Sequence, residues 1–134
     1  MAAQLASVPG VSRLAIAVDE NRRLVRAVRT GQPLVSAQDI SAMLAHIQRS
    51  LQTLPRIRYA MLIDIRRALL ADECRYSQDL VALRRELVSG FRKSAFLVET
   101  QVGRLQVQRF AREERLAARV YDDELAAVTY LTQL

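Results

Sequence analysis

The sequence predicts an α/β fold: a single domain whose mixed five-stranded sheet has about four helices packed on it. The first observation is the order of elements, because after two initial strand-like runs each further run alternates with a helical pattern. The second is size and composition, since 134 residues with 51% hydrophobic and 25% charged residues are typical of one globular domain. The strand-like runs are Leu14–Val18, Leu24–Val28, Ile57–Ile65, Ala95–Val98 and Ala117–Tyr121.

The N-terminal residues 1–11 are small and apolar and contain a Pro-Gly pair, which predicts a loose lead-in before the domain at 12–134. No apolar run approaches the ~20 residues of a membrane-spanning helix, and no basic stretch with an apolar core marks a secretory signal. The one cysteine, Cys74, excludes an internal disulfide framework and suits a reducing compartment. The sequence therefore predicts a cytoplasmic protein.

The first two strands form a predicted hairpin. Leu14–Val18 and Leu24–Val28 flank the polar connection Asp19-Glu-Asn-Arg22, and two β-like runs around such a connection are typical of a hairpin. Arg26 shares its face of the second strand with apolar residues. We therefore expect Arg26 to lie at a sheet edge or to pair with an acid.

The first helix and the central strand follow. Ser36 can cap the first backbone amides of a helix, and Asp39 three residues later completes a capping-box pattern. Apolar residues then recur at helical spacing until Pro55 closes the segment. The strand Ile57–Ile65 is apolar on both faces over Tyr59–Ile63, which is typical of a central parallel strand covered on both sides.

Three further helices are predicted after this strand. A mixed loop over Arg66–Tyr76 leads to a helix opened by Ser77, and a third helix spans Thr100–Glu114. Asp122 is expected to cap the last helix. The residues expected to face inward from the last two helices are Val102, Leu105, Phe110, Leu125, Val128 and Leu131.

The net charge of +6 is carried almost wholly by arginine, since Lys93 is the only lysine. An arginine excess is found in proteins that contact nucleic acid or anionic lipid, but a coding bias toward arginine produces the same composition. Arg104, Arg112 and Arg115 fall along one side of the third helix. That side is either the solvated face of an amphipathic helix or a phosphate-contacting face, which keeps nucleic-acid binding as a third alternative.

Candidates for chemistry are few. His46, the only histidine, lies beside the apolar stripe of the first helix, where a structural role is favoured. Asp64 ends the central strand, where α/β proteins place catalytic acids, although pairing with Arg66 or Arg67 explains it as well. Cys74 has no histidine near it in sequence and is expected to be an inert thiol. The sequence therefore predicts no catalytic residue, no metal site and no cofactor.

Two stretches resemble STAS domains, the sulfate-transporter and anti-sigma-factor-antagonist family, and most of all a divergent branch of STAS-like bacterial proteins. One is a central strand that ends in an apolar run and an acid, and the other is a strand followed, after one helix, by a closing strand and an acidic helix start. The resemblance covers roughly residues 13–131 and implies a STAS-like fold. Its segments are Met61-Leu-Ile-Asp64, Ser94-Ala-Phe-Leu-Val98, Arg119-Val-Tyr-Asp-Asp-Glu-Leu-Ala-Ala127 and Tyr130-Leu131.

The resemblance also implies a working surface. In regulatory STAS domains the loop after the central strand leads into an Asp-Ser-Ser helix start, where a partner kinase phosphorylates one serine and the surrounding surface binds that partner. Ungapped counting from Asp64 places the family's aspartate near Asp72 and its phosphorylated serine near Glu73. Glutamate cannot accept phosphate but carries a permanent negative charge, and Ser77 is the alternative acceptor.

We therefore predict a non-enzymatic regulatory or protein-interaction module with a protein partner. Arginines of the loop would make charge-assisted contacts to acids of that partner, while the loop acids set the register. The alternative is an anionic small molecule, nucleotide or lipid headgroup bound at the Gly103–Arg104 turn, where backbone amides suit an anion. Self-association through a sheet edge or through the apolar segment Met1–Val11 is left open. The predicted partner-binding residues are Arg66, Arg67, Asp72, Glu73, Arg75 and Ser77.

Overall fold

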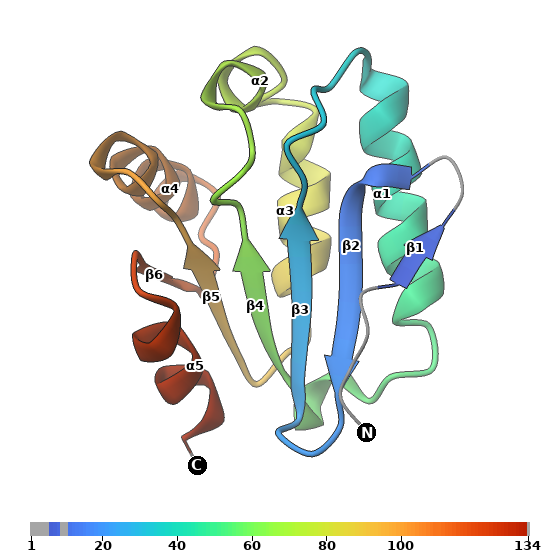
Figure 1. Cartoon of the computed structure of the whole chain (residues 1–134), viewed down its shortest axis with the longest axis vertical. Helices are drawn as coiled ribbons and strands as arrows, with labels where there is room; N and C mark the ends of the chain where they lie inside the picture. The colour runs from blue at the N-terminus through green and yellow to red at the C-terminus, as the bar shows by residue number, and fades with distance from the viewer. Residues whose placement is uncertain (1–5, 9–10, 134) are drawn as a thin grey trace.

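The computed structural model describes residues 6–8 and 11–133, and it contains one six-stranded sheet in the order β1-β2-β3-β4-β5-β6 (Figure 1). The strands are β1 (Ala6–Val8), β2 (Val11–Asp19), β3 (Leu24–Arg29), β4 (Ala60–Asp64), β5 (Lys93–Leu97) and β6 (Arg119–Tyr121). The helices are α1 (Ala37–Ser50), α2 (Leu70–Arg75), α3 (Leu80–Val88), α4 (Gln101–Glu113) and α5 (Glu124–Thr132), with a short 3₁₀ helix η1 (Arg56–Arg58).

The sheet is mixed, as predicted. β1, β2 and β3 pair antiparallel, whereas β3, β4, β5 and β6 pair parallel. The carboxyl ends of β3, β4 and β5 therefore lie at one edge of the sheet, below α2 in Figure 1. All five predicted strands are present, and β1 adds a sixth inside the predicted lead-in 1–11; residues 1–5 and 9–10 of that segment lie outside the described residues.

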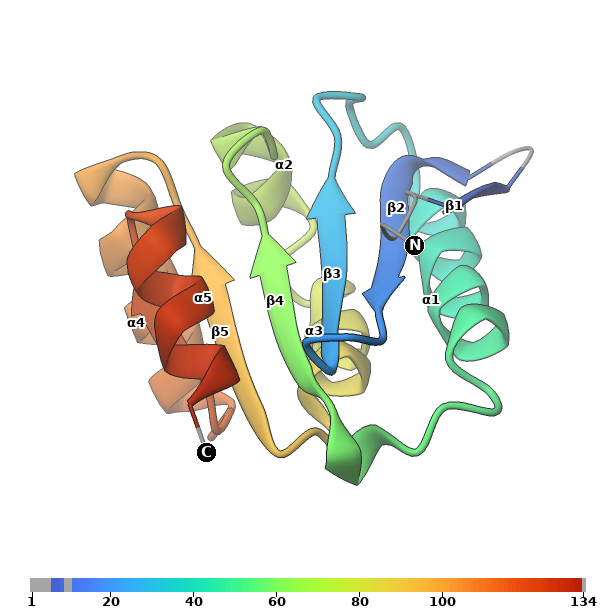
Figure 2. The same ribbon diagram turned by 60° about the horizontal axis from the view of Figure 1, so that its bottom comes forward.

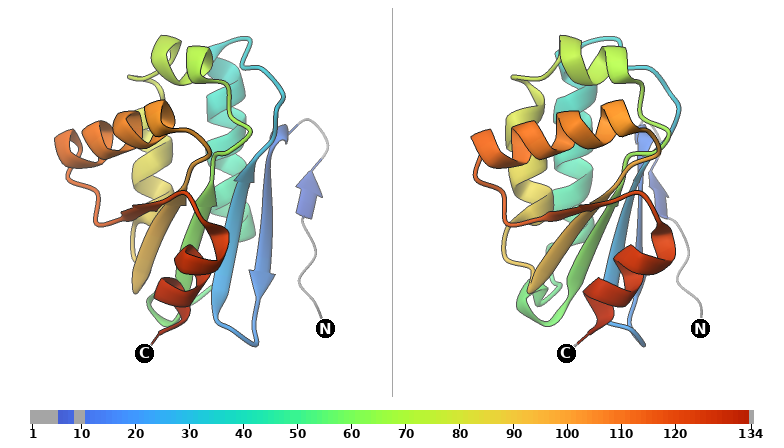
Figure 3. Two further views of the ribbon diagram at one scale, coloured as in Figure 1. Left: turned by 60° about the vertical axis from the view of Figure 1, so that its left-hand side comes forward. Right: turned by 90° about the vertical axis from the view of Figure 1, so that its left-hand side faces the viewer.

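Helices cover both faces of the sheet, as Figures 2 and 3 show, with α1, α3 and α4 on one face and α5 on the other. Alternate strand residues explain this division, because successive side chains point to opposite faces. Met61, Ile63 and Phe96 belong to the larger core cluster, whereas Leu62 and Leu97 pack with the smaller cluster that includes α5. β4 is buried at all five positions, which confirms the predicted central strand.

Local signals near the first helix act as predicted. The side chain of Ser36 accepts a hydrogen bond from the backbone amide of Gln38, and Asp39 completes a capping box with the Ser36 backbone. The carboxylate of Asp39 also accepts from the backbone amide of Val35 at 2.7 Å, which holds the pKa of Asp39 below its ordinary value. Such local bonds use amides that have no partner within the helix, so the start of α1 could be predicted from sequence.

The central strand is shorter than predicted. Residues Arg56–Arg58 form η1 instead of strand, and Ile57 is 70% exposed. Pairing with β3 begins only at Ala60, whose amide donates to the carbonyl of Arg23 at 2.9 Å. The predicted strand start at Ile57 is therefore wrong, because no neighbouring strand extends far enough to pair with it in the described structure.

The inward faces of α4 and α5 also differ from prediction. Phe110 is buried, but Val102 and Leu105 are more than half exposed, and Leu125 of α5 is 74% exposed. Val107 takes the inward position on α4 that was expected of Leu105. The cap of α5 is Asp123 rather than the predicted Asp122.

The predicted loop over Arg66–Tyr76 contains the short helix α2, and the next helix begins at Leu80 rather than at Ser77. Leu69 precedes α2 without a side-chain cap. No local capping signal therefore marks this helix, and contacts distant in sequence hold it.

His46 provides a pH-dependent contribution to stability. It is fully buried in α1, with Nδ1 3.2 Å from Ser50 Oγ, and burial followed by repulsion from Arg49 lowers its pKa. In the unfolded chain His46 becomes protonated near pH 6.5, whereas in the folded protein it stays neutral to a lower pH. The free energy of unfolding should therefore fall as the pH falls below about 6.5. The slope should reach at most about 1.4 kcal/mol per pH unit.

Urea unfolding between pH 7.5 and 5 checks this prediction. His46→Leu should flatten the dependence in that window, because the chain has no other histidine. The lowered pKa of Asp19 and of Asp39 affects stability only as the pH falls through the acid range below about 3.8. An unchanged slope in the variant would assign the pH dependence to another group.

Candidate functional site

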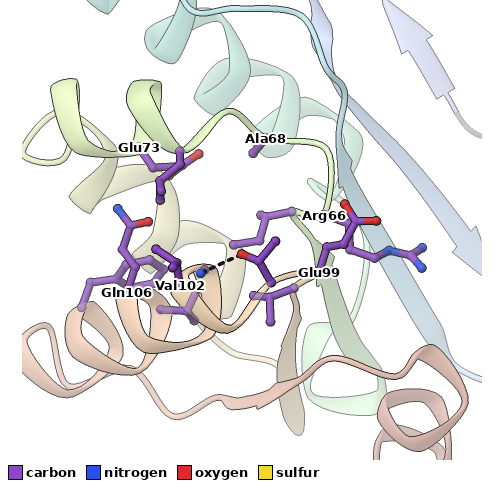
Figure 4. A pocket seen from close by; sticks show the side chains of 13 residues that line it. Arg66, Ala68, Glu73, Glu99, Val102 and Gln106 are labelled. Carbon is purple, nitrogen blue, oxygen red and sulfur yellow. Dashed lines mark hydrogen bonds between the residues drawn. The ribbon is translucent and has the colours of Figure 1, made fainter.

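A cleft of about 350 Å³ lies between α2 and α4, at the carboxyl ends of β4 and β5 (Figure 4). We call it the α2–α4 cleft. This edge of a parallel sheet is where open α/β folds bind ligands. Apolar side chains form most of its lining. The lining residues are Ile65, Arg66, Ala68, Leu70, Glu73, Val98, Glu99, Thr100, Val102, Gly103, Gln106, Val107 and Phe110.

The two helices approach each other across the cleft. Nε2 of Gln106 on α4 lies 3.5 Å from Sγ of Cys74 on α2, within hydrogen-bond distance for sulfur. Figure 4 shows Glu73 and Gln106 on opposite sides of the opening. The inner wall is formed by buried side chains, among them Val98 and Val107.

Apolar side chains are also exposed at the mouth of the cleft. Leu70 on α2 is 44% exposed and Val102 on α4 is 58% exposed, and both line the cleft. Leu69, just before α2, and Leu105 of α4 are exposed as well, but neither lines the cleft. We call Leu70 and Val102 the apolar rim. Exposed apolar side chains around a cavity are typical of binding sites.

Two of the predicted partner-binding residues, Asp72 and Glu73, tie α2 to the end of β3 and the chain after it. Glu73 is buried and accepts a hydrogen bond from Nη1 of buried Arg29 at 2.6 Å. Asp72 accepts from the backbone amide of Leu34 at 2.9 Å. Both bonds reach the end of β3 and the chain after it, so these carboxylates position the upper wall of the cleft.

Arg66 belongs to an ion-pair network with Asp64 of β4 and Glu124 of α5. Asp64 accepts two hydrogen bonds from its guanidinium, at 3.0 and 2.7 Å, and Glu124 of α5 accepts a third at 2.9 Å. The carboxylate of Asp64 in particular raises the pKa of Arg66 above its ordinary value. Glu124 also pairs with Arg26 at 3.3 Å, which is the acid partner expected for that residue.

Asp64 was considered either as a catalytic acid or as an ion-pair partner of Arg66 or Arg67, and in the structure it pairs with Arg66. In Figure 4 the guanidinium of Arg66 points away from the cleft. Its contribution to the cleft is thus the stem of the side chain rather than the charge.

The remaining predicted partner-binding residues lie around α2. Arg67 and Arg75 are exposed, and the guanidinium of Arg75 stacks 5.4 Å from the ring centre of Tyr76. Ser77 is half-buried, and its carbonyl accepts from Nη2 of Arg84 at 3.0 Å. Arg67 and Arg75 are thus exposed charges near the cleft, as is Glu99, which lines it.

The Gly103–Arg104 turn is occupied by its own helix cap. The amide of Gly103 donates to Oγ1 of Thr100 at 3.0 Å, and the amide of Arg104 donates to the Thr100 carbonyl at 2.9 Å. The guanidinium of Arg104 pairs with Asp122 at 3.2 Å. Both amides that were expected to meet an anion therefore have partners within the protein.

The structure thus brings two predicted sites together, because Arg66, Glu73 and Gly103 line the same cleft. The sequence reading missed Gln106 as a cleft residue and placed Val102 inside the core. It also did not identify Arg29, which directly follows the predicted strand Leu24–Val28.

Within residues 6–8 and 11–133, no group of three or more His, Cys, Asp and Glu side chains could hold a metal ion. In the same residues, every helix is too short or too polar to cross a membrane.

Comparison with known proteins shows the fold. No protein-family model matches the sequence, and no curated protein is similar enough in sequence to count as a relative. The structure is similar to that of an uncharacterized protein from the DUF3478 family, with a SpoIIAA-like fold, from Shewanella loihica PV-4. The match covers 97% of this chain and 92% of that chain, with a TM-score of 0.54 and 14% sequence identity. The fold is thus SpoIIAA-like, which confirms the predicted STAS-like fold, and identity this low shows the fold alone.

Proposed function

We propose that this chain with a SpoIIAA-like fold is a non-enzymatic protein-interaction module that docks an apolar anchor of a partner in the α2–α4 cleft. The observation that carries the proposal is the apolar rim, with Leu70 and Val102 exposed on the two helices that form the cleft. Protein interfaces concentrate their binding energy where one aromatic or aliphatic side chain fills such a pocket. The site therefore suits an amphipathic partner helix with one large apolar side chain.

The exposed arginines near the cleft indicate which charges the partner would carry. Arg67 and Arg75 are exposed at either end of α2, and neither forms an ion pair within the described residues. Acids flanking the apolar anchor of the partner would meet these guanidinium groups, adding specificity and association rate more than affinity. Asp72 and Glu73 serve this site by positioning α2.

The alternatives from sequence have less support. Arg104, the first arginine of the proposed phosphate-contacting face, is paired with Asp122. The neighbouring Arg109 of the same helix pairs with Glu113 at 3.6 Å. Part of the positive charge of α4 is therefore balanced internally, which disfavours nucleic acid as the partner.

Val102→Asp should weaken partner binding at least tenfold, because it places a carboxylate in the apolar pocket where the anchor would lie. The partner is first identified by capture from a native lysate, and its affinity for purified wild-type and variant protein is then measured by calorimetry. Leu125→Asp is the matched control, since Leu125 is also an exposed apolar residue of a helix but lies on α5. Equal affinities of the wild type and Val102→Asp would refute the docking site, as would an equal loss in both variants.

A further inference from the structure

Arg29 is a buried cation whose hydrogen-bonding capacity is mostly unused. Its side chain is 4% exposed, and Nη1 makes one hydrogen bond, to Glu73 at 2.6 Å. Its Nε and Nη2 have no hydrogen-bond partner within the described residues. Native proteins seldom leave buried donors without an acceptor, so these two N–H groups mark a place where an acceptor fits.

This guanidinium lies directly behind the α2–α4 cleft. It lines a small internal cavity of about 20 Å³, which has room for one water-sized group such as a carboxylate oxygen. Ile65, Glu73 and Phe110 line both this cavity and the cleft, so these three side chains form the wall between them. Arg29 is therefore separated from the cleft by these three side chains, one of which is its own partner Glu73.

We propose that the α2–α4 cleft binds a medium-chain carboxylate, with its apolar chain in the cleft and its carboxylate on Arg29. The cleft volume of about 350 Å³ is at the lower end of the range for small-molecule pockets, roughly 300–1,000 Å³. Its mainly apolar lining matches an alkyl chain. The arginine stays charged at any physiological pH and binds carboxylates through two parallel hydrogen bonds.

Glu73 acts as the internal competitor of the ligand. Its carboxylate makes one hydrogen bond to Arg29, whereas a carboxylate approaching along the fork of the guanidinium makes two. The exchange leaves one negative charge beside Arg29 both before and after, so neither end state holds an unpaired buried cation. Glu73 comes from α2, a helix of six residues without a side-chain cap.

The inference rests on the cleft of the proposed function and adds its regulation, because a bound carboxylate would exclude the anchor of the partner. The binding test below uses no protein partner. Failure of the carboxylate site therefore leaves the docking proposal standing, and the reverse also holds.

Calorimetric titration of the purified chain with octanoate and with 1-octanol tests the proposal, since the two ligands share the alkyl chain and differ in the carboxylate. The wild-type chain should bind octanoate at least tenfold more tightly than octanol. Glu73→Gln should raise the preference for octanoate over octanol at least tenfold above that of the wild type, because the competing charge is gone.

The double variant Arg29→Met/Glu73→Met covers the case in which Glu73→Gln does not fold. It removes both buried charges together, a replacement that proteins commonly tolerate. This variant should bind octanoate and octanol equally. Equal binding of the two ligands by the wild type would overturn the proposal, as would a preference for octanoate that survives in the double variant.

Discussion

Glu73→Ala should lower the free energy of unfolding by about 3–5 kcal/mol, because it leaves the guanidinium of Arg29 buried without its counter-charge. Arg29 and Glu73 are 3% and 8% exposed, so water cannot replace the lost carboxylate without opening the structure. Urea unfolding followed by circular dichroism measures the change. The effect should appear as a lower midpoint with little change in the slope against urea concentration.

Two controls separate this effect from the loss of any carboxylate. Glu113→Ala removes an exposed acid that pairs with Arg109 at 3.6 Å, and it should cost less than about 1 kcal/mol. Arg29→Met combined with Glu73→Met should recover most of the stability, because no unpaired charge remains. A double variant as unstable as Glu73→Ala would mean that packing, rather than the unpaired cation, causes the loss.

Phe96→Ala should destabilise the protein by about 3–5 kcal/mol, the usual cost of removing a buried phenyl ring. Phe96 lies on β5, is 1% exposed and packs edge-on against Phe110 of α4, with ring centres 5.5 Å apart. The substitution would leave a cavity between the sheet and α4. Thermal and urea unfolding of the purified variant provide the measurement.

The control for this substitution is Leu125→Ala on α5. Leu125 is 74% exposed, so its truncation should change stability by no more than about 0.5 kcal/mol. A loss below about 1 kcal/mol for Phe96→Ala would contradict the described packing of β5 against α4.

Most of the fold could be predicted because its signals are short-ranged. The capping box of Ser36 and Asp39 involves residues three positions apart, and the structure contains it. The β4 strand could be recognised from an uninterrupted apolar run, since a strand covered on both faces has no polar side. Both signals lie within a single element and need no knowledge of its neighbours.

The predictions were wrong where the buried side of a helix depends on the elements that pack against it. On α4 the apolar residues form two overlapping stripes, and the periodicity alone does not say which stripe faces the sheet. The structure buries Val107 and Phe110 and exposes Val102 and Leu105. α2 was missed for a related reason, because its six residues carry no cap and are held by Asp72 and Glu73.

The candidate site was predicted in part. Glu73 and Gly103 were both chosen from sequence, as parts of two separate sites 30 positions apart, and they meet in one cleft. The sequence treated Glu73 as a surface charge, because no local pattern distinguishes a buried acid from an exposed one. Its partner Arg29 lies 44 positions away.

The sequence by itself determined the order of the five strands β2 to β6 and of the four helices α1, α3, α4 and α5, the start of α1 and the central position of β4. These features follow from hydrogen bonds and hydrophobic periodicity among residues close together in the chain. Only the tertiary structure decided that α2 closes over the carboxyl end of the sheet, that Glu73 is buried on Arg29, and that Val102 is exposed at a cleft. The physical reason is that burial and ion pairing depend on which distant segments cover a side chain, and parallel strands bring such segments together only when the sheet forms.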